Sequence, residues 1–402
     1  MKPKREKITL DDLNEEAAPS ALGETSDHDV AAARFRRQQS DAAEAIKRHK
    51  KLTDRVAHEQ QIVDSFGEVL QANFGHRFSI NIPPAPRAKL TKPKRTPEEA
   101  VLVISDSHIG KIVKPSQTLG FGNYNTKIFL DRLYFLEKTV TRLIQHNVHN
   151  PVERINVLLL GDLVEGMLGH GSEIPMRELI APQVLIASLA FYQFIARLSR
   201  VAPVTVRGLG GNHSRFPGIQ AKKCPTENRF SNFDYIALGQ IEQLIQVSGI
   251  DRVKMILEEN PFQVFDIQGW RFKIGHGDHL KGGDKAMGVP AHSIGREINA
   301  TTQRYAARGQ RPPDYYLVGD KHRHMSLQTA TGRWMCNGAF FSDCGYSMTE
   351  NFTPGKPFQT FFGMHPEIGK SWSYELTLDR APSVPLQYDF PSHLRNRILA
   401  HE

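Results

Sequence analysis

Residues 100–108 read AVLVISDSH, and residues 155–162 read INVLLLGD. Each stretch begins with a short apolar run, which is typical of a buried strand, and ends in residues with carboxylate or imidazole side chains. Residues 127–147, which lie between the two stretches, have the composition of a helix. Because strands that alternate with helices form layers of helix and sheet, this region predicts an α/β fold.

The same alternation continues along the chain. It predicts helices at 176–200, 231–248 and 291–308, and strands at 203–208, 262–267, 270–275, 315–319, 325–330 and 333–338. We expect the aromatic, glycine-rich segment 338–372 to supply the core of a second sheet and a closing loop. The alternative for this segment is that its aromatic side chains stack on nucleic-acid bases.

Polar side chains of the kinds that bind metal ions follow five of the predicted strands. In α/β proteins, functional sites usually lie at the carboxyl ends of strands. Carboxylates, neutral imidazoles and an amide oxygen suit a pair of divalent ions that share one carboxylate. The five motifs are Asp106-Ser107-His108, Gly161-Asp162-Leu163-Val164-Glu165, Gly211-Asn212-His213, His276-Gly277-Asp278-His279 and Gly319-Asp320-Lys321-His322-Arg323-His324.

In this order the motifs resemble those of the calcineurin-like metallophosphoesterase superfamily, which read D-x-H, G-D-x-x-(D/E), G-N-H-(D/E), H and G-H-x-H. The resemblance covers roughly residues 100–380. It implies a four-layer αββα sandwich with two divalent metal ions, Mn²⁺ being the first expectation and Fe, Zn or Co the alternatives. The chain looks like the nuclease and DNA-repair exonuclease branch, and its C-terminal part resembles metallophosphoesterases encoded by tailed phages.

The resemblance also implies roles for individual residues. Ser214 stands where the superfamily has an acid that orients the histidine before it, and we expect Glu165 to replace that acid. The implied metal ligands are Asp106, His108, Asp162, Asn212, His276, His322 and His324. The implied catalytic residues are Asp162, as the bridging ligand, and His213, as the group that protonates the leaving oxygen. Residues expected to orient ligands or to bind phosphate are Glu165, Arg215, Asp278, His279, Asp320 and Arg323, with Lys281 as a further phosphate-binding candidate.

Composition argues against a disordered, a membrane-spanning or a secreted protein. The chain has 402 residues, of which 40% are hydrophobic and 23% are charged, so wholesale disorder is excluded. No apolar run approaches the roughly 20 residues that cross a bilayer, and the charged N-terminus lacks the apolar core of a secretory signal. Three widely spaced cysteines disfavour a disulfide framework and favour the cytoplasm, the host's in the case of a phage protein. The net charge of +8 favours an acidic partner such as nucleic acid.

We expect the chain to consist of five segments. Residues 31–80 are rich in good helix formers, and this helical extension is expected to be solvated, to self-associate or to bind a protein partner. The basic, Pro-rich linker is either a spacer or an arm that contacts phosphate. The segments are a disordered tail at 1–30, the helical extension at 31–80, the linker at 81–98, a metallophosphoesterase catalytic domain at 99–385 and a C-terminal tail at 386–402.

Together, these expectations predict that the protein is a metal-dependent phosphoric ester hydrolase. Its leading function is that of a DNA or RNA nuclease, which cleaves phosphodiester bonds with a water molecule activated by the two ions. A phosphatase or pyrophosphatase acting on a small nucleotide or a phosphoprotein would use the same ions and is one alternative. The other alternative is a non-catalytic protein that binds a partner. No membrane partner is expected.

Overall fold

The computed structural model describes residues 95–167, 177–217, 227–281, 290–349 and 355–400, together with Lys50 and Ala57. The chain divides into two compact units, residues 1–91 and residues 92–402. The expected tail at 1–30 lies outside the described residues. So does the helical extension at 31–80, apart from Lys50 and Ala57, which are both helical. Most of the expected linker also lies outside them.

One sheet has six strands in the order β11-β10-β1-β2-β3-β4. Strands β1 to β4 are parallel to one another, whereas β10 is antiparallel to β1 and β11 is antiparallel to β10. The strands span β1 (Glu98–Ile104), β2 (Val152–Leu159), β3 (Val204–Gly208), β4 (Val253–Ile256), β10 (Phe358–His365) and β11 (Gly369–Thr377).

The other sheet has five strands in the order β5-β6-β7-β9-β8. Strands β5 and β6 form a hairpin whose two loop residues, Gln268 and Gly269, both have positive φ, as a tight two-residue hairpin turn requires. Strands β6, β7 and β9 are parallel. The strands span β5 (Gln263–Ile267), β6 (Trp270–Ile274), β7 (Tyr315–Val318), β8 (Met325–Gln328) and β9 (Arg333–Cys336).

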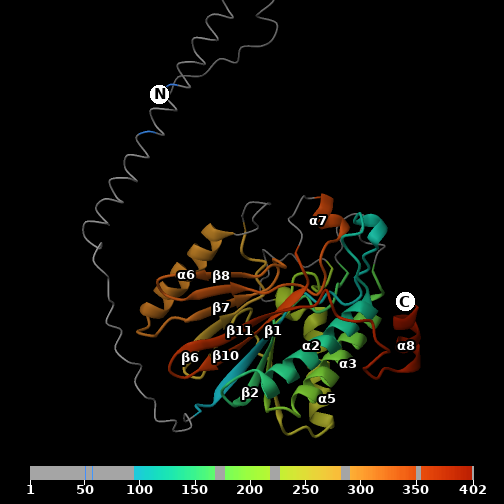
Figure 1. Ribbon diagram of the computed structural model, residues 1–402, viewed down its shortest axis with the longest axis horizontal. Coiled ribbons are helices and arrows are strands. Elements are labelled where there is room, and N and C mark those ends of the chain that lie inside the picture. The colour runs from blue at the N-terminus through green and yellow to red at the C-terminus, as the bar shows by residue number, and fades with distance from the viewer. Residues whose placement is uncertain are drawn as a thin grey trace, which may run out of the picture. The chain divides into compact units, whose positions relative to one another are not determined.

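Helices cover the outer face of each sheet. Figure 1 shows α2, α3 and α5 on one side of the strands and α6 on the other. Side chains of Asn125 and Asn232 accept hydrogen bonds from the first turns of α2 and α5, and so cap these helices. The helices span α2 (Thr126–His146), α3 (Ile180–Leu198), α4 (Glu227–Phe230), α5 (Phe233–Val247), α6 (Ala291–Ala306), α7 (Gly345–Thr349) and α8 (Ser392–Leu399), with a short 3-10 turn, η2, at Pro115–Gln117.

The alternation of side chains along β1 shows how the layers form. Ala100, Leu102 and Ile104 belong to the core that β1 shares with the helices, whereas Val101 and Val103 belong to the core between the two sheets. Successive side chains of a strand point to opposite faces, so a strand covered on both faces is apolar throughout. The α/β class and the four-layer αββα sandwich expected from the sequence are confirmed.

Two expectations for the C-terminal part differ from the structure. Segment 338–372 does not extend the second sheet, because β10 pairs with β1 in the first sheet. Phe340, Phe361 and Phe362 of this segment are fully buried, so these three rings cannot stack on bases. Segment 386–402, expected to be a tail, contains α8, and Leu394 and Ile398 of this helix are buried in the main core.

Helix α3 is long and apolar enough to cross a membrane by length and composition, whereas no such segment is expected from the sequence. Half of its apolar stretch is buried inside the protein. Phe191, Phe194 and Ile195 of α3 are fully buried in the core beneath the first sheet.

Buried polar side chains join the two sheets just beyond the end of β1. The side-chain oxygen of Gln359, on β10, accepts a hydrogen bond from the backbone N–H of Ser105 (3.0 Å) and another from the side chain of Asn337 (2.8 Å), which follows β9. Gln359 and Asn337 are both fully or almost fully buried. This network therefore fixes the chain directly before Asp106.

We expect Gln359→Leu to lower the free energy of unfolding by about 2–3 kcal/mol, because it leaves the buried Ser105 N–H without its acceptor. Urea denaturation followed by circular dichroism measures the change. Gln328→Leu is the matched control, since Gln328 is exposed on β8, and we expect a change within about 0.5 kcal/mol. Equal effects of the two substitutions would contradict the role given to the network.

Candidate metal centre

The five sequence motifs meet where the carboxyl ends of strands from both sheets come together. Asp106 and His108 follow β1, Asp162 follows β2, and Asn212 follows β3, all in the first sheet. His276 follows β6, and Asp320 and His322 follow β7, in the second sheet. The backbone N–H of Asp320 donates to both carboxylate oxygens of Asp106 (3.1 Å each), so the loops of the two sheets are in direct contact.

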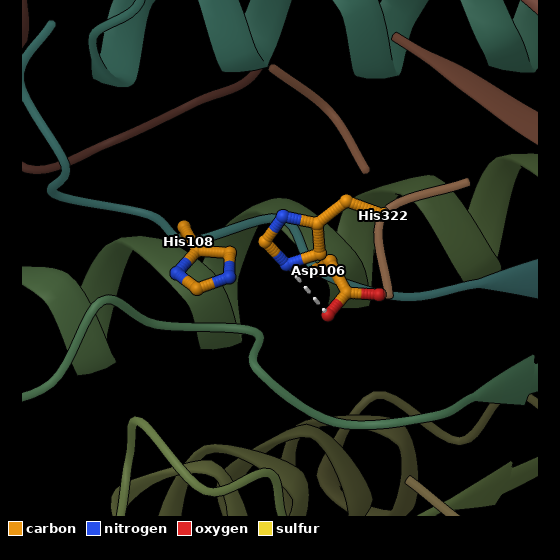
Figure 2. Close-up of side chains that lie close together, drawn as sticks. All are labelled: Asp106, His108 and His322. Carbon is orange, nitrogen blue, oxygen red and sulfur yellow. Dashed lines mark ion pairs between the residues drawn. The ribbon is translucent and has the colours of Figure 1, made fainter. Parts of the chain in front are cut away.

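Carboxylates and imidazoles from these loops form three groups that could hold a metal ion. Within each group the ligand atoms lie within 4.8 Å of one another. Figure 2 shows the first group, in which the ring of His322 faces the carboxylate of Asp106 beside the ring of His108. Asp106, His108 and Asp162 each belong to two groups, so the groups form one continuous cluster. The groups are Asp106–His108–His322, His108–Asp162–His213 and Asp106–Asp162–His276.

The backbone at the cluster is strained in a way that aims the side chains inward. Seven described residues other than glycine have positive φ, and five of them lie in the cluster or beside it. Such a conformation costs about 1–3 kcal/mol per residue and persists only where the surroundings enforce it. The five residues are Asp106, His108, Asp162, Asp320 and His322, with φ between 43° and 62°.

Hydrogen bonds between neighbouring loops hold these conformations. The N–H of Asp106 donates to the carbonyl of Gly161 (3.1 Å), and the N–H of His108 donates to the carbonyl of Asp162 (2.9 Å). A Cβ atom on Gly211 would lie 1.9 Å from Oδ1 of Asp162, so only glycine lets the third loop approach this carboxylate. The spacing of the loops is therefore fixed by backbone contacts.

The ring of His276 lies among hydrogen-bond acceptors on both of its nitrogens. Its Nδ1 donates to the carbonyl of Leu160 (2.7 Å). Its Nε2 lies 3.2 Å from Oδ2 of Asp162 and 2.9 Å from Oδ1 of Asn212. Burial alone would lower the pKa of His276, but the carboxylates of Asp162, Asp320 and Asp106 raise this pKa to about 10. The Nε2 side of this ring thus requires a proton or another cation.

His108 presents a buried nitrogen without a hydrogen-bond partner. Its Nδ1 donates to Oε2 of Glu165 (2.6 Å), and Oε1 of Glu165 also pairs with Lys111 (3.3 Å). This contact fixes the tautomer, as a carboxylate behind a metal-binding imidazole does. Burial lowers the pKa of His108 and favours its neutral form. The lone pair of Nε2, which has no hydrogen-bond partner among the described residues, then points into the cluster.

The carboxylates of the cluster remain ionised. Burial alone would raise the pKa of Asp162, but the neighbouring rings of His276, His213 and His108 hold this pKa well below its ordinary value. In the same way, His322 and His276 outweigh burial and lower the pKa of Asp106. Two ionised carboxylates, an amide oxygen and neutral imidazole nitrogens are a donor set that fits divalent transition metals.

His213 lies at the rim of the cluster. Its backbone N–H donates to Oδ1 of Asp162 (2.9 Å), and its ring packs edge-on against His108 at 4.6 Å between centroids. The side chain of His213 is 18% exposed, whereas those of His108 and His276 are at most 1% exposed. Oε2 of Glu165 is 3.8 Å from Nδ1 of His213, so Glu165 lies near this ring while its short hydrogen bond goes to His108.

His324, a predicted metal ligand, is not brought into the cluster. Its Nε2 pairs with Oε1 of Glu375 (2.9 Å), and its ring packs against Phe358. Residues two apart share a face only where the backbone is extended. The left-handed conformation of His322 turns the chain between the two histidines and sends them to different places.

The remaining predicted residues divide between the cluster and its surroundings. Asp320 lies 3.6 Å from Nε2 of His276 and pairs with Lys321, so it belongs to the cluster. Asp278 pairs with Arg229, and Arg215 donates to the carbonyl of Asn212. His279 pairs with Glu297 of α6 and belongs to none of the three candidate metal-binding groups. Arg323 is half-buried in the loop of His322.

Sequence reasoning missed Asp234 and Phe341. Asp234 is fully buried, and it accepts hydrogen bonds from the N–H groups of Val164 (3.1 Å) and Gly211 (2.9 Å), so it ties together two of the loops of the cluster. The ring of Phe341 packs edge-on against His108 and His322. In sequence, Asp234 is only an acid in the first turn of a helix, which is too common a feature to mark it.

Solved structures of similar fold include phosphoesterases. No family model matches the chain, and no curated protein matches it. One similar structure is a novel archaeal phosphodiesterase, with 12% identity over 69% of this chain and 99% of that chain and a TM-score of 0.33. Another is Vps29 from Entamoeba histolytica, complexed with Zn²⁺, with 14% identity over 70% of this chain and 94% of that chain and a TM-score of 0.32.

A third similar structure is a conserved protein from Streptococcus pneumoniae TIGR4, described as a predicted phosphoesterase. It has 10% identity over 70% of this chain and 98% of that chain, and its TM-score is 0.23. At these identities the likeness concerns the fold, and at TM-scores below 0.5 it assigns no activity to this chain.

We expect Gly211→Ala to weaken Mn²⁺ binding at least about 10-fold, because the added Cβ would displace the carboxylate of Asp162. Isothermal titration calorimetry of the metal-free protein measures the affinity. Gly239→Ala is the matched control, since a Cβ at Gly239, within α5, meets no atom within 4 Å. It should keep wild-type affinity and gain up to about 1 kcal/mol of stability. Equal Mn²⁺ affinity in both variants would contradict this account of the centre.

Proposed function

We propose that the chain is a metal-dependent phosphoesterase that cleaves phosphodiester bonds. The observation that carries this proposal is the convergence of five side chains into one cluster that left-handed backbone enforces. Four of them, Asp106, His108, Asp162 and His276, are buried, and His322 is partly exposed. Such strain is retained where a site must be preorganised. The order of the five motifs, with its resemblance to the calcineurin-like metallophosphoesterases, supports the same reaction.

Two divalent ions fit the donors of the cluster. Asp106, His108 and His322 would hold one ion, and Asn212 and His276 would hold the other, with the carboxylate of Asp162 available to both. When bound, the ions would offset the negative charge of the phosphate and acidify a water molecule. Mn²⁺ is our first choice, and Fe, Zn and Co suit the same donors.

Residues of the chain orient the two metal-binding rings and supply a proton to the leaving group. Glu165 holds the ring of His108 through Nδ1, and the carbonyl of Leu160 holds the ring of His276 in the same way. Both rings therefore present Nε2 to the cluster. His213, which is partly exposed at the rim, is the imidazole that can reach the oxygen of the leaving group and give it a proton.

Within this class we propose a nuclease that acts on DNA or RNA in the cytoplasm. The net charge of +8 supports a polyanionic substrate. Cys336 is a buried cysteine outside any disulfide, which suits a reducing compartment. The alternative is a phosphatase that acts on a small nucleotide. Measuring activity on a panel of substrates would distinguish it from a nuclease.

We expect the protein with Mn²⁺ to hydrolyse bis(p-nitrophenyl) phosphate and a single-stranded oligonucleotide, and we expect EDTA to abolish both activities. Asp162→Asn should lower kcat/KM for both substrates by about 100-fold or more, because it removes the charge that both ions would share. Asp266→Asn, at an exposed ion pair on β5, is the control and should stay within about twofold of wild type. The proposal would be wrong if neither substrate is cleaved with Mn²⁺, Fe²⁺, Zn²⁺ or Co²⁺. Cleavage of phosphate monoesters alone would favour a phosphatase.

The role of His213 predicts a dependence on the leaving group. His213→Gln should lower kcat for the oligonucleotide by about 100-fold or more, because an alkoxide must be protonated as it leaves. The same variant should lose much less activity on bis(p-nitrophenyl) phosphate, since nitrophenolate is a stable anion. Steady-state kinetics on the two substrates gives the comparison. Equal losses on both would assign His213 to metal or substrate binding rather than to proton transfer.

A further inference from the structure

A second polar pocket lies between α6 and the edge of the five-stranded sheet. Its volume is about 410 Å³, and its charged lining consists of Lys273, His279, Lys281, Arg296, Glu297 and Arg304. Among the lining residues that the structure describes, Glu297 is the one carboxylate, so these residues carry four permanent positive charges and one negative charge. We call this cavity the α6 pocket.

The carboxylate of Glu297 is paired with two side chains inside the pocket. Its Oε1 accepts a hydrogen bond from Lys273 (2.7 Å) and lies 3.4 Å from Nε2 of His279. Lys273 is buried and also donates to the hydroxyl of Thr301 (3.2 Å). These contacts form the floor of the pocket. Lys281, Arg296 and Arg304 are exposed, and the described part of the lining offers them no other carboxylate.

The sequence of α6 places its two arginines along the pocket. Residues 293, 296, 297, 300, 301 and 304 all line the pocket, and this spacing of three and four corresponds to one face of a helix. Ile294 and Ile298, on another face, are buried in the core between α6 and the sheet. Arg304 lies eight positions after Arg296, which is about 12 Å along the helix axis.

That length suits a chain of phosphates rather than a single phosphate. One strand of a nucleic acid carries a charge about every 3.4 Å along the axis of a B-form helix, and a single strand spaces its phosphates more widely than this rise, so about 12 Å reaches beyond one phosphate to its neighbour. A concave pocket of this volume accommodates part of one strand, whereas a duplex needs a broader surface.

A short stretch of chain connects the α6 pocket to the candidate metal centre. His276, in the cluster, and His279, in the pocket lining, are three residues apart, so their Cα atoms are at most about 11 Å apart. A strand with one phosphate at the metal centre can therefore place neighbouring phosphates in the pocket.

We propose that the α6 pocket binds the sugar–phosphate backbone of a single-stranded nucleic acid whose scissile bond lies at the metal centre. This inference rests on the proposed nuclease function and identifies a binding site for its substrate beyond the reacting phosphate. Arg296 and Arg304 contact phosphates of the strand, and Lys281 adds charge at the rim.

The test compares two double variants of the full chain that lose the same charge. Arg296→Gln/Arg304→Gln changes the pocket, and Arg142→Gln/Arg200→Gln changes exposed arginines of the α2 and α3 layer. Fluorescence anisotropy with a labelled 15-nucleotide oligothymidylate, in EDTA and at several salt concentrations, measures binding without cleavage. Each lost contact to a single strand should reduce the salt slope by about 0.7.

We expect the pocket variant to reduce the slope of log K against log salt by about 1.4 and to weaken binding about 10- to 30-fold at 0.1 M salt. Its ratio of oligonucleotide to bis(p-nitrophenyl) phosphate hydrolysis should fall by a similar factor, while the control variant keeps the wild-type ratio. Arg296→Lys/Arg304→Lys should retain most of the salt slope, which separates loss of charge from loss of folding.

Three results would overturn the inference. They are wild-type binding by the pocket variant, an equal loss in the control variant, and a loss of binding to duplex DNA or anionic lipid vesicles without a loss for the single strand. Failure of the proposed function is distinguishable, because it would abolish hydrolysis of both substrates by the wild-type protein while the binding titration would still report on the pocket.

Discussion

Two ionised carboxylates, those of Asp106 and Asp162, are buried at the junction of the two sheets. They determine which side chains can lie next to them and how the neighbouring loops are held. A buried charge costs several kcal/mol unless an opposite charge compensates it. The rings of His276 and His322 lie against these carboxylates for this reason, and burial keeps His108 neutral beside them. Each carboxylate is thus held ionised by an imidazole ring that comes from the other sheet.

The rest of the domain works as a support for this junction. Left-handed turns direct the side chains inward, and their cost is met by hydrogen bonds between loops that follow different strands. Asp234 ties the loops after β2 and β3 together, and Gln359 and Asn337 fix the chain before Asp106. Because each support comes from a distant part of the chain, the geometry of the centre depends on the packing of both sheets.

Local patterns predicted much of this structure, and long-range geometry supplied the rest. Apolar runs placed β1, β2 and β3 within a few residues, and the polar residues after them led to the cluster. The pairing of β10 with β1 has no local signature, so segment 338–372 was expected in the other sheet. The position of His324 was missed because the spacing rule assumes extended backbone, and a left-handed residue precedes it by two positions. The metal-binding and catalytic roles of the clustered residues stay predictions.

The pairing of the first strand of the domain with one of the last has a consequence for biosynthesis. Gln359 hydrogen-bonds to Ser105 across 254 residues of sequence, and the donors of the cluster are spread from Asp106 to His322. A chain emerging from the ribosome therefore lacks part of the candidate metal centre until most of the domain has been translated. Since a ligand that binds only the folded state stabilises it, the supply of metal at that late moment would act on the yield of folded protein.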